Sequence, residues 1–189
     1  MVSLVVKTFA FLAFVFMVSL TGVARAATDV EALLARMTLR EKIGQMTMLT
    51  LNAVSEGELP FGPAEPHALD LPRMRRAIVD YGVGTVFNIG HHAFERDHWR
   101  AVVADLQALA ARETRLKIPL LYGVDALHGM NYAMGATLFP HQIGLAAAWD
   151  PELVRQVAQV TAYEARAASI PWVFAPTAEP GRNPVHARF

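Results

Sequence analysis

The most constraining feature of this chain is an almost entirely apolar run at residues 118–124, IPLLYGV, which ends abruptly in Asp125. Only the hydroxyl of Tyr122 interrupts the run. Such runs are typical of strands that are covered on both faces, as in a parallel sheet. Polar residues gather just after it, and α/β folds build their sites at the carboxyl ends of their strands. The pattern therefore predicts a buried strand that delivers a carboxylate to a site.

Strand and helix patterns alternate along the rest of the chain. Short capped helices are predicted first, because residues 28–31 and 38–41 both match the S/T-x-x-E capping box. Asp97 and Asp150 are predicted N-caps of two later helices. The remaining elements are strands within residues 45–51, 84–89 and 171–175, and helices at residues 72–81, 97–115 and 150–169. Alternating units of this kind imply a parallel sheet, either doubly wound or closed into a (β/α)8 barrel.

The number of strands indicates how much of a fold is present. Four strands are half of a (β/α)8 barrel, and a complete barrel typically needs about 250 residues, whereas this chain has 189. We therefore expect an α/β domain at residues 27–189 that forms the amino-terminal half of a TIM-type barrel, about four βα units, with the rest of the domain missing.

The first 26 residues match the pattern of a secretory signal peptide. Lys7 precedes an apolar stretch at residues 8–24, and Ala24 and Ala26 supply the small residues that signal peptidase requires. An uncleaved membrane anchor is the alternative, but about 17 apolar residues lie at the lower edge of what spans a bilayer. The sequence predicts cleavage after Ala26, export to a periplasm or to the extracellular space, and no membrane attachment after cleavage.

Composition and motifs argue against several other classes of protein. The chain has 17 basic and 17 acidic residues and no basic patch, so no nucleic-acid partner is predicted. It has no cysteine, which excludes disulfides and thiolate metal sites. A metal interpretation of the histidines is not favoured, because no H-E-x-x-H occurs and adjacent histidines in a strand point to opposite faces. The histidines concerned are His91, His92, His98, His128 and His141. A polar loop after the second predicted strand is the preferred interpretation of the adjacent pair His91-His92.

Several ordered motifs resemble the amino-terminal barrel of glycoside hydrolase family 3, the family of β-glucosidases and glucan exohydrolases. They are GVDALHG at residues 123–129, GATLFPHQIGLAAAWDPEL at residues 135–153 and WVFAPT at residues 172–177. TLREKIGQM and GVGTVFN, further upstream, resemble the opening of the same family. The resemblance covers roughly residues 30 to 189 and implies a barrel that binds a terminal sugar at its mouth.

The resemblance implies two substrate-binding residues, and a third candidate follows from its place in the loop after Asp125. The aspartate that matches Asp125 accepts hydrogen bonds from sugar hydroxyls, and such charge-assisted bonds hold the ring in one orientation; a cap of the turn after the strand is the alternative. Arg182 matches an arginine that donates to the sugar through its rigid guanidinium fork. Its surroundings depart from the family pattern, with Glu179 in place of an aspartate, so a surface arginine is the alternative. His128 is a candidate for the same pocket, or bonds its own loop.

The resemblance also implies retaining hydrolysis of terminal non-reducing β-D-glucosyl residues by two carboxyl groups, without a cofactor. In the family the nucleophilic aspartate follows a later barrel strand, and the acid/base usually comes from beyond the barrel. We therefore expect both catalytic residues beyond Phe189. A pair formed by Asp125 and Glu179 is the alternative within this chain. Two hypotheses remain: the start of an exported O-glycosyl hydrolase whose isolated 189-residue chain is inactive, and a non-catalytic half barrel with at most weak sugar binding. The preferred sugar, the linkage and the oligomeric state are not indicated.

Overall fold

The computed structural model describes residues 29–57 and 64–177. The predicted signal peptide, Glu179 and Arg182 lie outside the described residues. The chain divides into two compact units, residues 1–42 and 43–189. None of the helices in the described ranges combines the length and the apolar composition that crossing a bilayer requires.

In the first unit, α2 (Asp29–Arg36) is followed by the start of α3 (Leu39–Gln45). The second of the two predicted capping boxes is confirmed at α3. Thr38 Oγ1 accepts a hydrogen bond from Glu41 N at 3.2 Å, and Glu41 Oε2 accepts one from Thr38 N at 2.8 Å. These reciprocal bonds satisfy two amides that the first helical turn leaves free. The other box begins at Thr28, outside the described residues.

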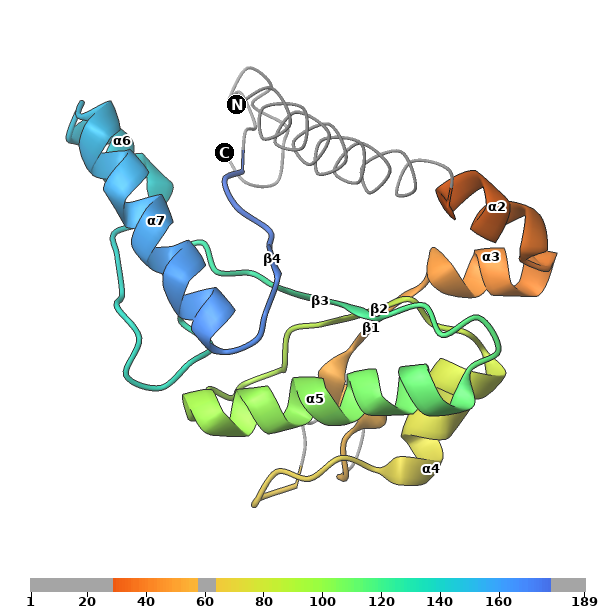
Figure 1. The fold of residues 1–189 in the computed structure, drawn as a ribbon. Coiled ribbons are helices and arrows are strands. Elements are labelled where there is room, and N and C mark those ends of the chain that lie inside the picture. The colour runs from red at the N-terminus through yellow and green to blue at the C-terminus, as the bar shows by residue number, and fades with distance from the viewer. Residues whose placement is uncertain (1–28, 58–63, 178–189) are drawn as a thin grey trace, which may run out of the picture. The chain divides into compact units, whose positions relative to one another are not determined.

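The second unit contains a four-stranded parallel sheet (Figure 1). Its strands are β1 (Met48–Thr50), β2 (Thr85–Phe87), β3 (Leu121–Val124) and β4 (Trp172–Val173). Their spatial order is β1-β2-β3-β4, and every neighbouring pair is parallel. A doubly wound sheet reverses its strand order at a switch point, whereas a (β/α)8 barrel adds strands in sequence. The order therefore decides between the two predicted folds and confirms the partial barrel.

Helices connect successive strands. Between β1 and β2 lie the 3₁₀ turn η1 (Leu51–Val54), α4 (Leu71–Met74) and the π-helical η2 (Arg75–Asp80). α5 (Arg96–Glu113) connects β2 to β3. α6 (Gln142–Ala147) and α7 (Pro151–Ala167) connect β3 to β4. In Figure 1, α4 and α5 lie on the same side of the strands, as right-handed crossovers require when strands are added in sequence.

Two of the predicted helix starts have different outcomes. Asp150 caps α7 as predicted, because its Oδ1 accepts from Glu152 N at 3.0 Å and from Leu153 N at 3.1 Å. The prediction that Asp97 caps α5 is wrong, since the cap position is Glu95 and Asp97 lies in the first turn. The physical reason is upstream. Backbone bonds tie Phe94 to Tyr132 and Met134, which fixes the chain in extended form up to the point where the helix begins.

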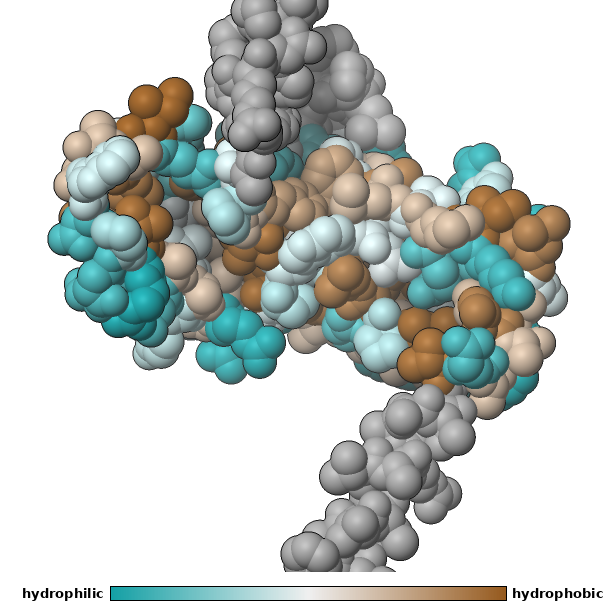
Figure 2. Space-filling model, turned by 90° about the horizontal axis from the view of Figure 1, so that it is seen from above, coloured by the Kyte–Doolittle hydropathy of each residue, from teal (hydrophilic) through white to brown (hydrophobic). Residues whose placement is uncertain are grey.

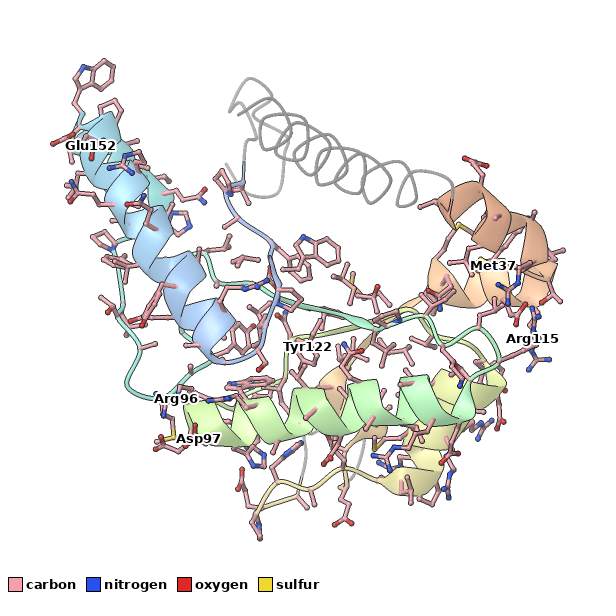
Figure 3. All side chains as sticks on the ribbon, in the orientation of Figure 1. Met37, Arg96, Asp97, Arg115, Tyr122 and Glu152 are labelled. Atoms are coloured by element: carbon pink, nitrogen blue, oxygen red, sulfur yellow. The ribbon has the colours of Figure 1, made fainter. Side chains whose placement is uncertain are left out.

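One face of the sheet forms the core against the helices. Val86, Tyr122 and Val124 are buried there, and Tyr122 lies between the strands and α5 (Figure 3). Its ring contacts that of Trp99 of α5, with 5.6 Å between centroids. The connection is reinforced by Gln107, whose amide donates to Leu120 O and accepts from Leu120 N.

The opposite face of the sheet is more open. Met48, Leu121 and Trp172 are 43%, 41% and 38% exposed, respectively. Figure 2 shows hydrophobic colours over much of the middle of the surface seen from above. The expectation that the third strand is covered on both faces therefore fails at Leu121, although the three residues that follow it in β3 are buried.

Gly44, near the end of α3, permits a close approach between the helix and the turn before β2. A Cβ at this position would collide with the backbone carbonyl oxygens of Tyr81 and Gly82. The same approach allows Gly84 N to donate to Gly44 O at 3.0 Å and Gln45 Nε2 to donate to Gly82 O at 3.1 Å. The backbone cannot yield without breaking these bonds, so only glycine fits.

We expect Gly44→Ala to lower the free energy of unfolding by about 1–3 kcal/mol, because the added methyl group overpacks a backbone contact. Urea denaturation of the whole chain measures this. Gly144→Ala is the matched control in α6, where the new Cβ would meet only Pro140 Cβ at 3.3 Å. The gain in helix propensity offsets that contact, so the control should change stability by less than about 1 kcal/mol. Equal effects of both variants would contradict the prediction.

Candidate functional site

Polar side chains follow three neighbouring strands where each strand ends. Asn52 lies two residues after β1, Asn88 directly follows β2 and Asp125 directly follows β3. Asn52 Oδ1 accepts a hydrogen bond from Gly90 N at 2.8 Å, so it holds the loop after β2. Asn88 and Asp125 bond to each other. The carboxyl edge of the sheet therefore carries a connected set of amide and carboxylate groups.

Asp125 is the charged member of this set, and Asn88 holds it at two points. Asn88 Nδ2 donates to Asp125 Oδ2 at 2.7 Å. Asn88 Oδ1 accepts from Asp125 N at 2.8 Å. Asp125 is half-buried, and among the described residues no donor bonds its Oδ1. The second carboxylate oxygen is therefore available to an incoming hydroxyl or amide.

The backbone of Asn88 is itself fixed from both sides. Its N–H donates to Gly123 O at 2.9 Å, and its carbonyl accepts from Leu51 N at 3.3 Å and from the Tyr122 hydroxyl at 2.9 Å. Its φ of 43° lies in the left-handed region, which asparagine tolerates better than most residues. These three bonds fix the backbone of Asn88, and the two bonds of its amide to Asp125 orient its side chain.

Tyr132 lies close to the carboxylate, and Tyr122 lies close to Tyr132. Burial, followed by the charge of Asp125, raises the pKa of Tyr132. Burial, followed by Tyr132, raises the pKa of Tyr122 well above its ordinary value. The Tyr132 backbone is held by Trp99, whose indole N–H donates to Tyr132 O at 2.7 Å. Both phenols stay protonated at neutral pH, so neither tyrosine adds a negative charge to this edge.

The loop after Asp125 is shaped by Gly129. Its φ of 88° is unfavourable for any side chain, and a Cβ would collide with Thr137 O. Phe139 N donates to His128 O at 2.8 Å, which closes the loop on itself. Glu164 of α7 anchors the far side, because its carboxylate accepts from Thr137 N at 3.1 Å and from Thr137 Oγ1 at 2.8 Å.

The structure places His128 in this loop rather than on Asp125. Its ring contacts that of His141, with 4.9 Å between centroids. It is half-buried, and no hydrogen bond joins it to Asp125 within the described residues. His128 therefore borders the site, and its contact with sugar stays a prediction. The same holds for Arg182, which lies outside the described residues.

A cavity of about 480 Å³ lies next to the same loop, between α6, α7 and the end of β4. Its lining is mostly apolar and does not include Asp125; it includes Leu127, Leu145, Val154, Val157 and Val173. A pocket for a polar ligand needs donors and acceptors that fix its orientation. The polar side chains of the cavity are those of Gln142, Thr161 and Thr177, and they bond within the protein: Thr161 donates to Val157 O, and Thr177 donates to Gln142. The Asp125 edge provides a carboxylate, so it is the better candidate site.

The histidines away from this edge form a separate hydrogen-bond chain. Ser55 Oγ–H donates to Leu51 O at 2.9 Å, so Ser55 Oγ accepts from His67 Nε2–H at 2.9 Å. His67 Nδ1 then has only a lone pair and accepts from His98 Nε2–H at 2.8 Å. Ser55 is fully buried and its proton is bound to a carbonyl, so it is no nucleophile. Burial, then the charges of His98 and His92, lowers the pKa of His67 to about 4.

His92, in the loop after β2, also has structural partners. His92 Nδ1 contacts Gly90 O at 2.8 Å, and His92 Nε2 lies 2.7 Å from Glu65 Oε1. Within the ranges that the structure describes, no group of three or more His, Cys, Asp or Glu side chains is arranged to hold a metal ion.

Sequence reasoning found Asp125 and missed Asn88 and Glu164. Asn88 carried a usable signal, because it is a polar residue near the end of the predicted strand at residues 84–89, and the strand in fact ends one residue before it, at Phe87. Glu164 carried none. It looks like any acidic residue on a helix surface, and only the fold brings it to Thr137.

A parallel sheet with strands in sequential order and a carboxylate at its carboxyl edge is the arrangement found in (β/α)8 barrels, whose sites lie at that edge. The family model "Glycosyl hydrolase family 3 N terminal domain" matches residues 38–188. The chain belongs to glycosyl hydrolase family 3, and the resemblance inferred from its motifs is confirmed.

Individual relatives agree with this assignment. The chain is 32% identical to the lysosomal beta glucosidase of Dictyostelium discoideum, over 85% of this chain and 20% of the relative. It is 34% identical to the periplasmic beta-glucosidase of Salmonella typhimurium, over 87% of this chain and 18% of the relative. It thus spans about a fifth of the length of these relatives. A family 3 beta-N-acetylglucosaminidase structure from Paenibacillus matches with a TM-score of 0.51 and 27% identity, over 74% of this chain and 24% of that one.

The low pKa of His67 predicts a dependence of stability on pH. The unfolded chain binds a proton on this residue below about pH 6.5, whereas the folded chain binds it only below about pH 4. The unfolded state therefore binds more protons in this window, and native stability falls as the pH falls from about 6.5 to 4. We expect His67 to account for about 1–2 kcal/mol of that fall, since its partial burial moderates the effect.

His67→Gln keeps a donor to Ser55 but does not titrate, so urea denaturation between about pH 4 and pH 7 should show a shallower loss of stability. The exposed His91, whose φ is 64°, provides the control His91→Asn, which should retain the wild-type pH dependence. A His67→Gln variant with the wild-type profile would show that His67 is not the residue responsible.

Proposed function

We propose that this chain supplies the wall that binds the terminal sugar in a β-glucoside hydrolase. Membership of glycosyl hydrolase family 3 supports a hydrolase of glycosides. The main observation in support of this function is the Asp125 carboxylate at the end of β3. Its Oδ2 is bound by Asn88, and its Oδ1 is bound by no described residue. The names of two relatives, a lysosomal and a periplasmic beta-glucosidase, support glucose as the terminal sugar.

The chemistry assigned to Asp125 is binding. An ionised carboxylate only accepts hydrogen bonds, so it pairs with sugar hydroxyls, which donate. Such charge-assisted bonds are stronger than those between neutral groups and fix the orientation of the ring. Arg182 is proposed as a donor to the same sugar and His128 as a neighbour of it. No described residue is assigned a catalytic role.

The proposed reaction is retaining hydrolysis. One carboxylate attacks the anomeric carbon while a second carboxyl group protonates the leaving oxygen, and water then cleaves the glycosyl-enzyme. This chemistry needs no cofactor. In the proposed assignment, both reactive carboxyl groups come from parts of the enzyme other than residues 1–189.

Export through a cleaved signal peptide at residues 1–26 is proposed as well. It rests on the apolar stretch at residues 8–24 and the Ala24-Arg25-Ala26 cleavage pattern. The periplasmic location in the name of the Salmonella relative is compatible with this route. The domain boundary at residue 27 follows from the same proposal.

Asp125→Asn tests the binding role. Loss of a hydrogen bond to a charged group costs about 1.5–3 kcal/mol, so the dissociation constant for methyl β-D-glucopyranoside should rise at least about tenfold. NMR titration of the whole chain measures it, with methyl N-acetyl-β-D-glucosaminide as a second ligand. Asp97→Asn, at an exposed position of α5, is the control and should bind as the wild type does. Unchanged affinity in Asp125→Asn would refute the role, and tighter binding of the acetamido sugar would reassign the substrate.

The 189-residue chain itself should not hydrolyse p-nitrophenyl β-D-glucopyranoside above the uncatalysed rate, because its described residues contribute binding without a reactive pair. Release of p-nitrophenol measures this directly. Activity that Asp125→Ala and Glu179→Ala each abolish would instead assign the catalytic pair to this chain.

A further inference from the structure

The strongest feature that the proposed function leaves unexplained is the side chain of Asn88. It directly follows β2, is half-buried and is not needed to complete the sheet, since its backbone alone makes the bonds to Gly123 and Leu51. Its amide nevertheless contacts both the backbone N–H and the carboxylate of Asp125. A side chain that only filled space would not need this two-point contact.

The orientation of the amide follows from chemistry. Asp125 N–H can only donate a hydrogen bond, so the atom of Asn88 that faces it at 2.8 Å must be the carbonyl oxygen. The amide nitrogen then faces Asp125 Oδ2 at 2.7 Å and must donate to it. One carboxylate oxygen is thereby occupied and the other is left to a ligand.

We propose that Asn88 is the positioning residue for the Asp125 carboxylate: it fixes the rotamer of Asp125, occupies Oδ2 and presents the ionised Oδ1 to a hydroxyl of the terminal sugar. This inference rests on the proposed sugar-binding function and identifies the residue on which the geometry of that site depends. Asn88 acts through Asp125 and does not itself contact the sugar.

The proposal makes a specific demand on the residue at position 88. The residue must tolerate a φ of 43°, accept a hydrogen bond from Asp125 N–H and donate one to Oδ2. Asparagine meets all three demands. Aspartate meets the first two and fails the third when it is ionised, because two carboxylates at this distance repel each other. A protonated aspartate meets all three again, because its hydroxyl donates to Oδ2.

Asn88→Asp therefore gives a test with a pH signature that a structural role would not produce. At about pH 7.5 the variant should bind methyl β-D-glucopyranoside at least about tenfold more weakly than the wild type. At about pH 4.5 one proton is shared by the carboxyl pair, and the affinity should return to within about threefold of the wild type at the same pH. Tyr122 and Tyr132, the titratable groups that face the pair, do not interfere, because their pKa values are raised and both stay neutral across this range.

Two further variants complete the comparison. Asn88→Gly tolerates the backbone conformation but lacks the amide, so it should bind weakly at both pH values. Asn131→Asp adds the same charge at an exposed position of the loop and should bind as the wild type does at both. Wild-type affinity in Asn88→Asp at both pH values would overturn the proposal. So would a loss in Asn88→Asp that is equal at both, since that is the result expected of a merely structural role.

A measurement on the wild-type chain covers the case in which Asn88→Asp does not fold. The side-chain amide protons of Asn88, bound to a carboxylate, should exchange with water at least about tenfold more slowly than those of the exposed Asn131. Equal exchange rates would overturn the proposal. Slow exchange combined with no binding of the glucoside would leave Asn88 holding Asp125 and would refute the sugar-binding function instead, so the two failures are distinguishable.

Discussion

The pairing of β3 with a strand on each side is the interaction on which the rest of the structure depends. β3 is parallel to both β2 and β4, and its register aligns Phe87 with Gly123. The next residue of each strand follows from that register, so Asn88 arrives beside the start of the Asp125 loop. The core-facing side of β3 carries Tyr122, whose ring packs against Trp99 of α5. One backbone ladder thus determines both where the core lies and which polar groups meet at its edge.

The edge gains its chemical character from an imbalance of donors and acceptors. Asn88 directs one amide N–H and its carbonyl oxygen at Asp125. Asp125, when ionised, has acceptors to spare and no side-chain donor. The tyrosines nearby hold their protons. The result is a fixed surplus of acceptor capacity at the end of a buried strand, which suits a ligand that is rich in hydroxyl groups.

Local signals predicted the helix caps well and the contacts between elements poorly. The Thr38 box and the Asp150 cap depend on residues at most three positions apart, so sequence contains all the information that they require. The start of α5 depends on hydrogen bonds between Phe94 and residues 132 and 134. Residues so far apart in sequence give no local signal of this pairing, so Asp97 was predicted as the cap. α6 was not predicted, although residues 145–148, LAAA, favour helix, because the segment before it, residues 137–141, has the composition of a loop around Pro140. Asp125 was predictable from the end of its strand, whereas its partner Asn88 required the register.

The bond between Thr137 and Glu164 links two parts of the molecule that the chain itself keeps apart. The loop that begins at Asp125 is held at one end by β3 and at the other by the carboxylate of Glu164 in α7. Opening of α7 would therefore release the loop, and a loop ordered by a ligand would in turn protect α7. We therefore expect the loop and α7 to open together in local unfolding, so that protection of the loop would also be measured on α7.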